Sequence, residues 1–305
     1  MKHLEKYRGI FPAFYACYDD AGEISPERVR ALTEFLMDRG IKGVYVNGSS
    51  GECIYQSVED RKTVLENVME ASKGRLTVIA HVACNNTKDS QELARHAQSL
   101  HVDAIAAIPP IYFHLPEYAI AQYWNDISAA APDTDFVIYN IPQLAGVALT
   151  LSLFREMRKN PQVIGVKNSS MPVQDIQMLK AAGGEDCVIF NGPDEQFVSG
   201  RAIGAQAGIG GTYGVMPELF LKLDELFCEG RMEEACRLQY AIDSIIYKMC
   251  ECRGNLYAVI KEILRINEHL DIGGVRPPLP GLSGADYPIA KEAADMICRA
   301  RKAFC

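Results

Sequence analysis

The sequence predicts an α/β protein, a (β/α)8 TIM barrel with a C-terminal appendage of three helices. Eight short apolar runs alternate with eight longer amphipathic stretches along the chain, in the order that a (β/α)8 barrel requires. An open doubly wound sheet would usually show a GxGxxG fingerprint after its first strand, and none follows the first apolar run here. About 75 residues remain after the eighth unit and have helical patterns. We therefore expect a catalytic barrel domain at residues 1–230 and a helical extension at residues 231–305.

Each expected strand is a short apolar run that is typical of a buried strand. The eight runs are Ile10–Tyr15, Gly43–Asn47, Leu76–Val82, Ala104–Ile108, Phe136–Asn140, Val163–Lys167, Val188–Asn191 and Ala207–Gly210.

The stretches between the runs have helical patterns, and several carry start signals. Ser25 precedes Pro26, Ser57 is followed three residues later by Asp60, and Thr87 opens a polar turn. The barrel helices are expected at Pro26–Arg39, Ser57–Ser72, Thr87–Leu100, Pro116–Ala131, Leu151–Arg158, Gln174–Ala181, Asp194–Ile203 and Pro217–Cys228. The appended helices are expected at Arg231–Met249, Gly254–Glu268 and Asp286–Lys302, with the proline-rich segment Pro277–Gly281 before the last one.

Composition excludes several function classes. A net charge of −8 argues against nucleic acid or an anionic membrane as a partner, but not against a small anionic substrate. The 10 cysteines are scattered without the paired spacing of zinc sites, so no metal is expected. The start Met1–Lys6 lacks the apolar core of a signal peptide, and no apolar run is long enough to span a membrane. The sequence therefore predicts a cytoplasmic protein with reduced thiols.

Lys167 is the most informative residue of the chain. It lies near the end of the apolar run that begins at Val163, where an ordinary lysine just past a strand would extend into solvent. If it is buried instead, burial disfavours the ammonium form, and a neutral lysine is an amine nucleophile that forms a Schiff base with a ketone.

Other chemical groups follow neighbouring strands, and the active sites of (β/α)8 barrels lie at the C-terminal ends of the strands. Gly48–Glu52 holds two hydroxyls between glycines, which suits a carboxylate or a phosphate, although such clusters are more often simple turns. Tyr139 places a phenol at the end of the fifth strand, and Asp194 and Glu195 follow the seventh. Together with Lys167 these groups predict an anion cradle, a phenol and an amine in one barrel mouth, opposite acidic groups that can bind sugar hydroxyls.

The motifs GSSGE, YNIP, GVKNSS, GPDE and GIGGTYG, in this order, closely resemble those of the N-acetylneuraminate lyase and dihydrodipicolinate synthase superfamily of class I aldolases. The resemblance covers about residues 8 to 280. It implies that Lys167 is the Schiff-base lysine and Tyr139 the proton-shuttling tyrosine, with no cofactor. It further implies that Ser49 and Ser50 hold the carboxylate of pyruvate, and that Tyr112 reaches the active site of an adjacent subunit in a homotetramer.

Leu144 indicates which branch of the superfamily the chain resembles. Synthases that act on aspartate semialdehyde carry an arginine two positions after the proline of YNIP, and here Leu144 follows Pro142 and Gln143. A leucine cannot bind the second carboxylate of that substrate. The resemblance at this point is to the sialic acid lyases.

The remaining substrate contacts are implied by the same resemblance. Gly192, Asp194 and Glu195 match the segment that binds the polyol tail of the sugar, and Ser169 stands where these lyases usually have threonine. Gly210 and Gly211 follow from the last motif, although Gly211 stands where a serine often contacts the substrate. Tyr257 occupies a place where an aromatic residue often faces the substrate, and a core aromatic between helices would fit as well.

The expected reaction is the cleavage of N-acetylneuraminate (sialic acid) to N-acetylmannosamine and pyruvate through an imine on Lys167. One alternative is an aldolase or dehydratase for another 2-keto-3-deoxy sugar acid. A dihydrodipicolinate synthase is disfavoured by Leu144. A non-enzymatic sensor of pyruvate or sialic acid is disfavoured because the lysine, the tyrosine and the serine pair are all present.

Overall fold

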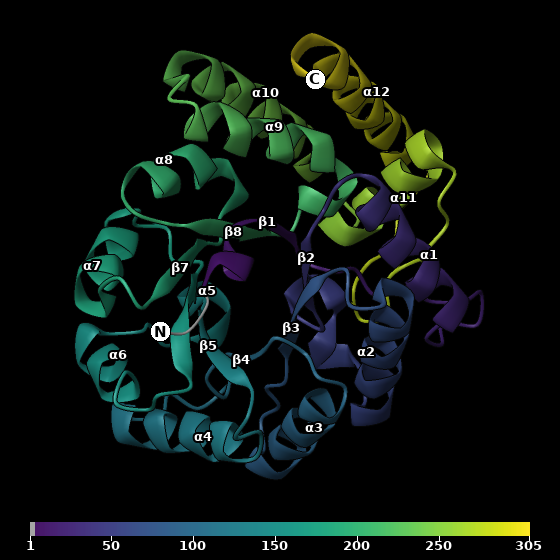
Figure 1. The fold of residues 1–305 in the computed structure, drawn as a ribbon. Coiled ribbons are helices and arrows are strands. Elements are labelled where there is room, and N and C mark those ends of the chain that lie inside the picture. The colour runs from purple at the N-terminus through teal and green to yellow at the C-terminus, as the bar shows by residue number, and fades with distance from the viewer. Residues whose placement is uncertain (1–3) are drawn as a thin grey trace. The chain divides into compact units, whose positions relative to one another are not determined.

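The computed structural model describes residues 4–305 and confirms the (β/α)8 barrel (Figure 1). The parallel strands follow one another in the order β1-β8-β7-β6-β5-β4-β3-β2, which is the cyclic order of a nearly closed barrel. They are β1 (Gly9–Pro12), β2 (Gly43–Val46), β3 (Thr77–His81), β4 (Ala104–Ala107), β5 (Asp135–Asn140), β6 (Val163–Asn168), β7 (Val188–Asn191) and β8 (Ala207–Gly210).

The strands are short and buried, which explains why they are visible in the sequence as continuous apolar runs. Every residue of β2, β4, β6, β7 and β8 is buried. The first strand differs from the expectation, because it ends at Pro12, after which Ala13 forms a single β-bridge and residues 14 and 15 are irregular although buried.

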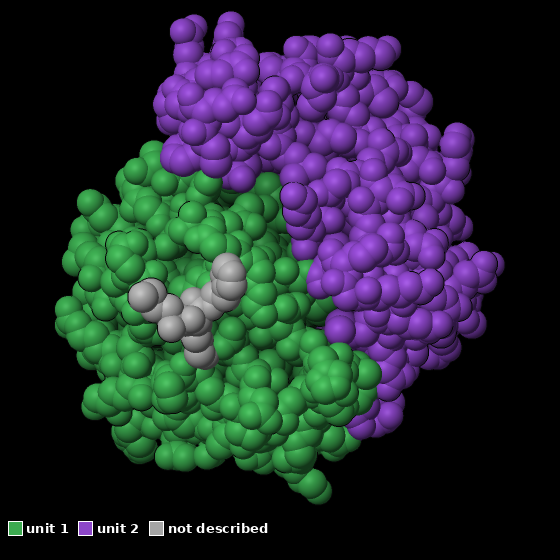
Figure 2. Space-filling model, in the orientation of Figure 1, with its two compact units in different colours: residues 1–11, 43–46, 77–210 green, residues 12–42, 47–76, 211–305 purple. Residues whose placement is uncertain are grey.

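The chain divides into two compact units, coloured separately in Figure 2. The first unit comprises Met1–Phe11, Gly43–Val46 and Thr77–Gly210, and the second comprises Pro12–Lys42, Asn47–Leu76 and Gly211–Cys305. The boundary expected between residues 230 and 231 stays a prediction. The sequence predicts that the start Met1–Lys6 is not a signal peptide, and residues 1–3 of it lie outside the described part of the chain. No helix within residues 4–305 combines the length and the apolar character that a membrane crossing needs.

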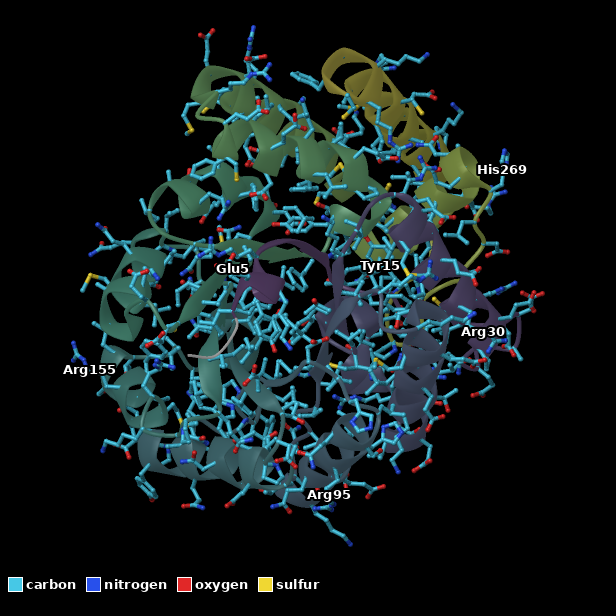
Figure 3. The ribbon with its side chains drawn as sticks, viewed as in Figure 1. Glu5, Tyr15, Arg30, Arg95, Arg155 and His269 are labelled. Carbon is cyan, nitrogen blue, oxygen red and sulfur yellow. The ribbon has the colours of Figure 1, made fainter. Side chains whose placement is uncertain are left out.

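Most helices of the first unit, α3, α4, α6, α7 and α8, lie on the outer side of its strands (Figure 1). Polar side chains such as Arg95 on α3 and Arg155 on α6 extend outward from them (Figure 3). Two helix starts differ from the expectation. Asn86 rather than Thr87 caps α3, and α8 begins at Phe197 rather than at Asp194, after a separate 3₁₀ turn. The sequence did not predict the four-residue helix α5. These helices are α3 (Thr87–Ser99), α4 (Glu117–Ala129), α5 (Pro142–Ala145), α6 (Leu151–Met157), α7 (Gln174–Gly183) and α8 (Phe197–Ala202).

The second unit is helical and contains the three appended helices that the sequence predicts. The start signals are confirmed, because Ser25 accepts from Arg28 N and Ser57 forms a reciprocal capping box with Asp60. The helices are α1 (Pro26–Asp38), α2 (Val58–Ser72), α9 (Pro217–Cys228), α10 (Met232–Cys250), α11 (Leu256–Glu268) and α12 (Asp286–Phe304).

Four alternating charges join helices of the second unit. Arg39, the C-cap of α1, pairs with Glu218 of α9 and with Glu268 of α11. Arg301 of α12 pairs with the same two carboxylates, at 3.0 Å and 2.6 Å. A closed network of this kind stabilises more than isolated surface pairs do, because each charge has two partners.

Candidate active site

Lys167 is buried within β6 and is not a surface lysine. Only 5% of the residue is exposed. In the register of the parallel sheet Lys167 lies opposite Tyr139 of β5, so the two side chains leave the sheet on the same face. The Lys167 Nζ lies 3.9 Å from the centroid of the Tyr139 ring. The amine and the phenol that the sequence predicts as partners are therefore adjacent.

Two further rings complete the surroundings of this amine, and sequence reasoning missed both. The Nζ of Lys167 lies 4.4 Å from the ring centroid of Tyr45 on β2. The rings of Tyr45 and Tyr139 meet edge to face at 5.7 Å, and His81 at the end of β3 lies 6.0 Å from Tyr139. The sequence did place Tyr45 and His81 in expected strands, and this position was the sign that could have identified them. The result is an aromatic enclosure that separates the amine from bulk water.

A chain of hydrogen bonds holds the ends of β5 and β6 together. Ser169 N donates to Asn140 O at 2.7 Å, and Asn140 Nδ2 donates to Asn168 Oδ1 at 2.6 Å. Asn168 Nδ2 continues to Ser170 Oγ, which donates to Asp175 at 2.7 Å. Buried amides that are satisfied in this way are rigid. The backbone that carries Tyr139 and Lys167 is therefore fixed immediately after both residues.

Gly192 and Ser169, both expected to contact the substrate, lie against each other. Gly192 N donates to Asn168 O at 2.8 Å, and a Cβ added to Gly192 would lie 2.0 Å from Ser169 Oγ. Only glycine allows this approach. Asp194 is buried at 6% exposure, whereas Glu195 is exposed to solvent.

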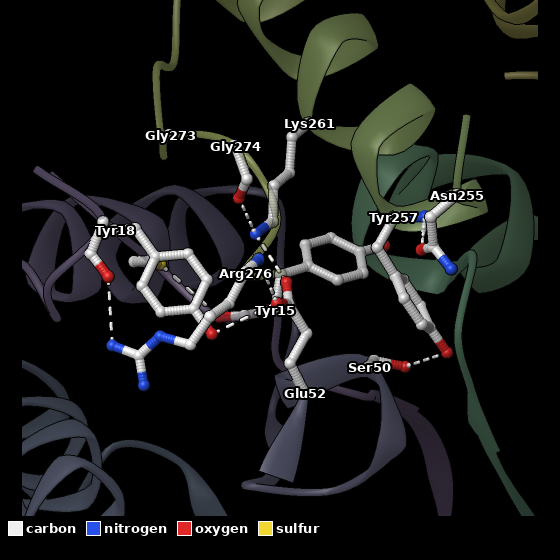
Figure 4. Close-up of polar contacts among 12 residues, drawn as sticks. Tyr15, Tyr18, Ser50, Glu52, Asn255, Tyr257, Lys261, Gly273, Gly274 and Arg276 are labelled. Carbon is white, nitrogen blue, oxygen red and sulfur yellow. Dashed lines mark hydrogen bonds and ion pairs between the residues drawn. The ribbon is translucent and has the colours of Figure 1, made fainter. Parts of the chain in front are cut away.

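The expected carboxylate cradle lies in the second unit as the tight turn Ser49–Gly51, followed by Glu52 in the left-handed region with a φ of 55°. Ser50 is buried, and its hydroxyl donates to Tyr257 Oη at 3.1 Å (Figure 4). Gly211 lies beside Ser50, since a Cβ added to Gly211 would lie 3.4 Å from Ser50 Oγ. Gly210 is the last residue of β8 and is buried.

Glu52 is held by a buried ion pair that the sequence did not reveal. Lys261 Nζ lies 2.9 Å from Glu52 Oε1, and the two side chains are 2% and 0% exposed. Tyr18 Oη and Arg276 N donate to Glu52 Oε2 at 3.1 Å and 2.8 Å (Figure 4). Burial lowers the pKa of Lys261, although the Glu52 carboxylate opposes that shift. The available signal was the lysine at the end of the apolar run Ala258–Ile260 on an amphipathic helix.

Tyr112 and Leu144 are exposed. Tyr112 is 86% exposed, packs edge to face on Phe113 at 5.0 Å, and has a φ of 87° that a bulky residue rarely adopts. Both rings line a groove of about 830 Å³ in the first unit, together with Tyr118 and Tyr123. Leu144 lies on α5 and is 64% exposed.

Comparisons with known proteins extend over the whole chain. Residues 6–295 match the model of the Dihydrodipicolinate synthetase family. An N-acetylneuraminate lyase of Mediterraneibacter gnavus is 73% identical over 304 residues, which are 100% of this chain and 96% of the relative. An N-acetylneuraminate lyase of Enterobacter sp. is 32% identical over 96% of this chain and 98% of its own length. A catalytic-lysine mutant of the sialic acid aldolase of Ruminococcus gnavus superposes with a TM-score of 0.99, 73% identity and full coverage of both chains.

Proposed function

Because the chain belongs to the Dihydrodipicolinate synthetase family, we propose that it is a class I aldolase that cleaves N-acetylneuraminate to N-acetylmannosamine and pyruvate. The observation that carries the proposal is the buried amine of Lys167 beside Tyr139. The related aldolase of Ruminococcus gnavus has a catalytic lysine, which supports the same role here. The relatives at 73% and 32% identity are N-acetylneuraminate lyases, which supports the substrate and a place in sialic acid catabolism.

The reaction proceeds through a Schiff base on Lys167. The neutral amine adds to the C2 ketone of the open-chain sugar acid, and loss of water leaves an imine that is then protonated. The protonated imine accepts the electron pair of the breaking C3–C4 bond, while Tyr139 takes the proton of the C4 hydroxyl. N-acetylmannosamine leaves as the aldehyde. The remaining enamine is protonated at C3, and water hydrolyses the imine to release pyruvate and regenerate Lys167.

The other expected residues bind the substrate in this proposal. Ser49 and Ser50 hold its carboxylate, which the compact hydroxyl-bearing turn supports. The sugar contacts are assigned to Ser169, Gly192, Asp194, Glu195, Gly210, Gly211 and Tyr257. The closeness of Gly192 to Ser169 supports the assignment of a shared contact surface to these two residues.

Leu144 argues against the synthase alternative in the structure as well as in the sequence. Its exposed apolar side chain offers no positive charge to a second carboxylate. An aldolase or dehydratase for another 2-keto-3-deoxy sugar acid would use the same Lys167 and differ only in the sugar contacts.

A homotetramer in the cytoplasm is part of the proposal. The exposed rings of Tyr112 and Phe113 along an apolar groove support an interface between copies of the chain. Light scattering over a range of protein concentrations tests the tetramer, with Tyr112→Asp expected to dissociate it. A monomer at every concentration would contradict it. Cell fractionation tests the location.

The deciding experiment measures pyruvate release from N-acetylneuraminate by the wild-type protein and by Lys167→Ala. We expect release by the wild type alone. If the wild type releases none but borohydride still traps pyruvate on it, the aldolase chemistry stands and the sugar is wrong. Trapping that survives in Lys167→Ala would exclude this lysine as the imine-forming residue.

A further inference from the structure

The first turn of α11 contacts the serine turn 49–51. Tyr257 is the second residue of α11, and its backbone N–H donates to the N-cap side chain of Asn255 at 2.9 Å. From this fixed position its phenol oxygen accepts the hydroxyl hydrogen of Ser50 at 3.1 Å (Figure 4). A cap that holds the helix start also holds the ring.

Gly211 leaves room for this contact. A Cβ at Gly211 would lie 3.4 Å from Ser50 Oγ and 3.7 Å from Tyr257 Oη, so a side chain there would touch both hydroxyls. The backbone of Gly211 is held by Tyr15, whose phenol donates to Gly211 O at 2.9 Å. The rings of Tyr15 and Tyr257 lie 6.4 Å apart. Gly211 itself offers no hydroxyl to Ser50, and the contact comes from Tyr257 instead.

The same helix holds the turn at a second point. Lys261 lies one helical turn after Tyr257, and its ammonium binds Glu52, two residues after Ser50. Glu52 also accepts from Tyr18 and from Arg276 N, so its carboxylate is held by three donors. Two contacts between one helix and one turn set both the distance and the rotation between them. The alignment of Tyr257 with Ser50 is therefore built into the second unit.

We propose that Tyr257 is a positioning residue that acts through Ser50. A hydroxyl group has one hydrogen to donate and rotates to suit its partners. When the carboxylate of the substrate is bound, the Tyr257 O–H donates to Ser50 Oγ, and the Ser50 O–H donates to the carboxylate. Each hydrogen bond in such a chain polarises the next and strengthens it. The inference rests on the proposed function, in which Ser50 binds the carboxylate, and it gives Tyr257 a role other than direct sugar contact.

The test measures the pyruvate concentration at which borohydride trapping of the imine is half-maximal. Tyr257→Phe keeps the ring and removes the hydroxyl, and we expect the half-saturating concentration to rise about fivefold, the size of one lost hydrogen bond. Tyr240→Phe is the matched control, because this exposed tyrosine of α10 loses the same atom. Its half-saturating concentration should equal that of the wild type.

Rescue separates positioning from a merely structural effect. Adding Gly211→Ser to Tyr257→Phe places a new hydroxyl beside Ser50 and should restore the wild-type concentration, whereas adding Gly211→Ala should not. If Tyr257→Phe melts below the assay temperature, Gly211→Leu provides a second route, because its side chain separates the two hydroxyls and should cause the same rise. An unchanged concentration in Tyr257→Phe, or equal recovery with alanine and serine, would overturn the inference and leave the proposed function intact. A wild type that never traps pyruvate would overturn both.

Discussion

Among residues 4–305, each compact unit buries one lysine, and the environments of the two lysines differ. Lys167 in the first unit lies against the faces of Tyr139 and Tyr45. Lys261 in the second unit lies 2.9 Å from the carboxylate of Glu52 and also donates to Gly274 O. An aromatic face attracts a cation diffusely, whereas a carboxylate and a carbonyl hold the Lys261 ammonium as a structural cation. Similar burial therefore accompanies a proposed chemical role at Lys167 and a structural role at Lys261.

The same substitution at both lysines should have opposite effects. Lys167→Met should abolish imine trapping and pyruvate release without loss of stability, because methionine fills the site and needs no solvation. Lys261→Met leaves the Glu52 carboxylate buried without its cation, and should lower the free energy of unfolding by about 3–5 kcal/mol. Urea unfolding and borohydride trapping of both variants measure the two effects.

A neutral replacement of the pair provides the control. Lys261→Met combined with Glu52→Gln removes both charges and should recover part of the lost stability. The comparison fails if Lys261→Met unfolds at the wild-type urea concentration, or if saturating pyruvate traps no imine on it while it is still folded.

The two rings beside Lys167 should also differ in their effects. Tyr139→Phe removes the proposed proton acceptor and should lower the turnover number about 10²–10⁴-fold while imine trapping persists. Tyr45→Phe keeps a ring beside the same amine and should have a smaller effect. Steady-state turnover and single-turnover trapping separate the steps, and equal loss of both in Tyr139→Phe would make that tyrosine a structural support.

The smallest expected effect is a change in stability on substitution of Asp60, the carboxyl group in the capping box of α2. Partial burial favours protonated Asp60, but hydrogen bonds from Arg276 and Ser57 outweigh it and lower the pKa of this carboxyl. A lowered folded-state pKa contributes stability above the unfolded value, and that stability is lost as the pH falls through the folded value. Asp60→Asn should therefore be less stable than the wild type by about 1 kcal/mol at pH 7. The two unfolding curves should converge below about pH 4, and a gap that persists at pH 2 would contradict this origin.

The sequence predicted what depends on local pattern. The run Val163–Lys167 and the capping pair Ser57 and Asp60 occur where the sequence placed them, because burial of a strand and capping of a helix use neighbouring residues. Glu52 as the partner of Lys261, and Tyr45 as a neighbour of Lys167, were not predictable in this way. Glu52 precedes Lys261 by 209 positions, and no spacing rule connects them before the chain folds. The short helix α5 was not predictable from the sequence, because four residues are too few to show a helical periodicity.

The contact between Gly192 and Ser169 limits how this protein can be engineered. Saturation mutagenesis at Gly192 should yield mainly inactive or misfolded clones, because every other residue brings a Cβ to 2.0 Å from Ser169 Oγ. Gly211 admits a Cβ at ordinary contact distances. A library intended to alter sugar preference should therefore vary position 211 and keep position 192 fixed, or change Gly192 only together with Ser169.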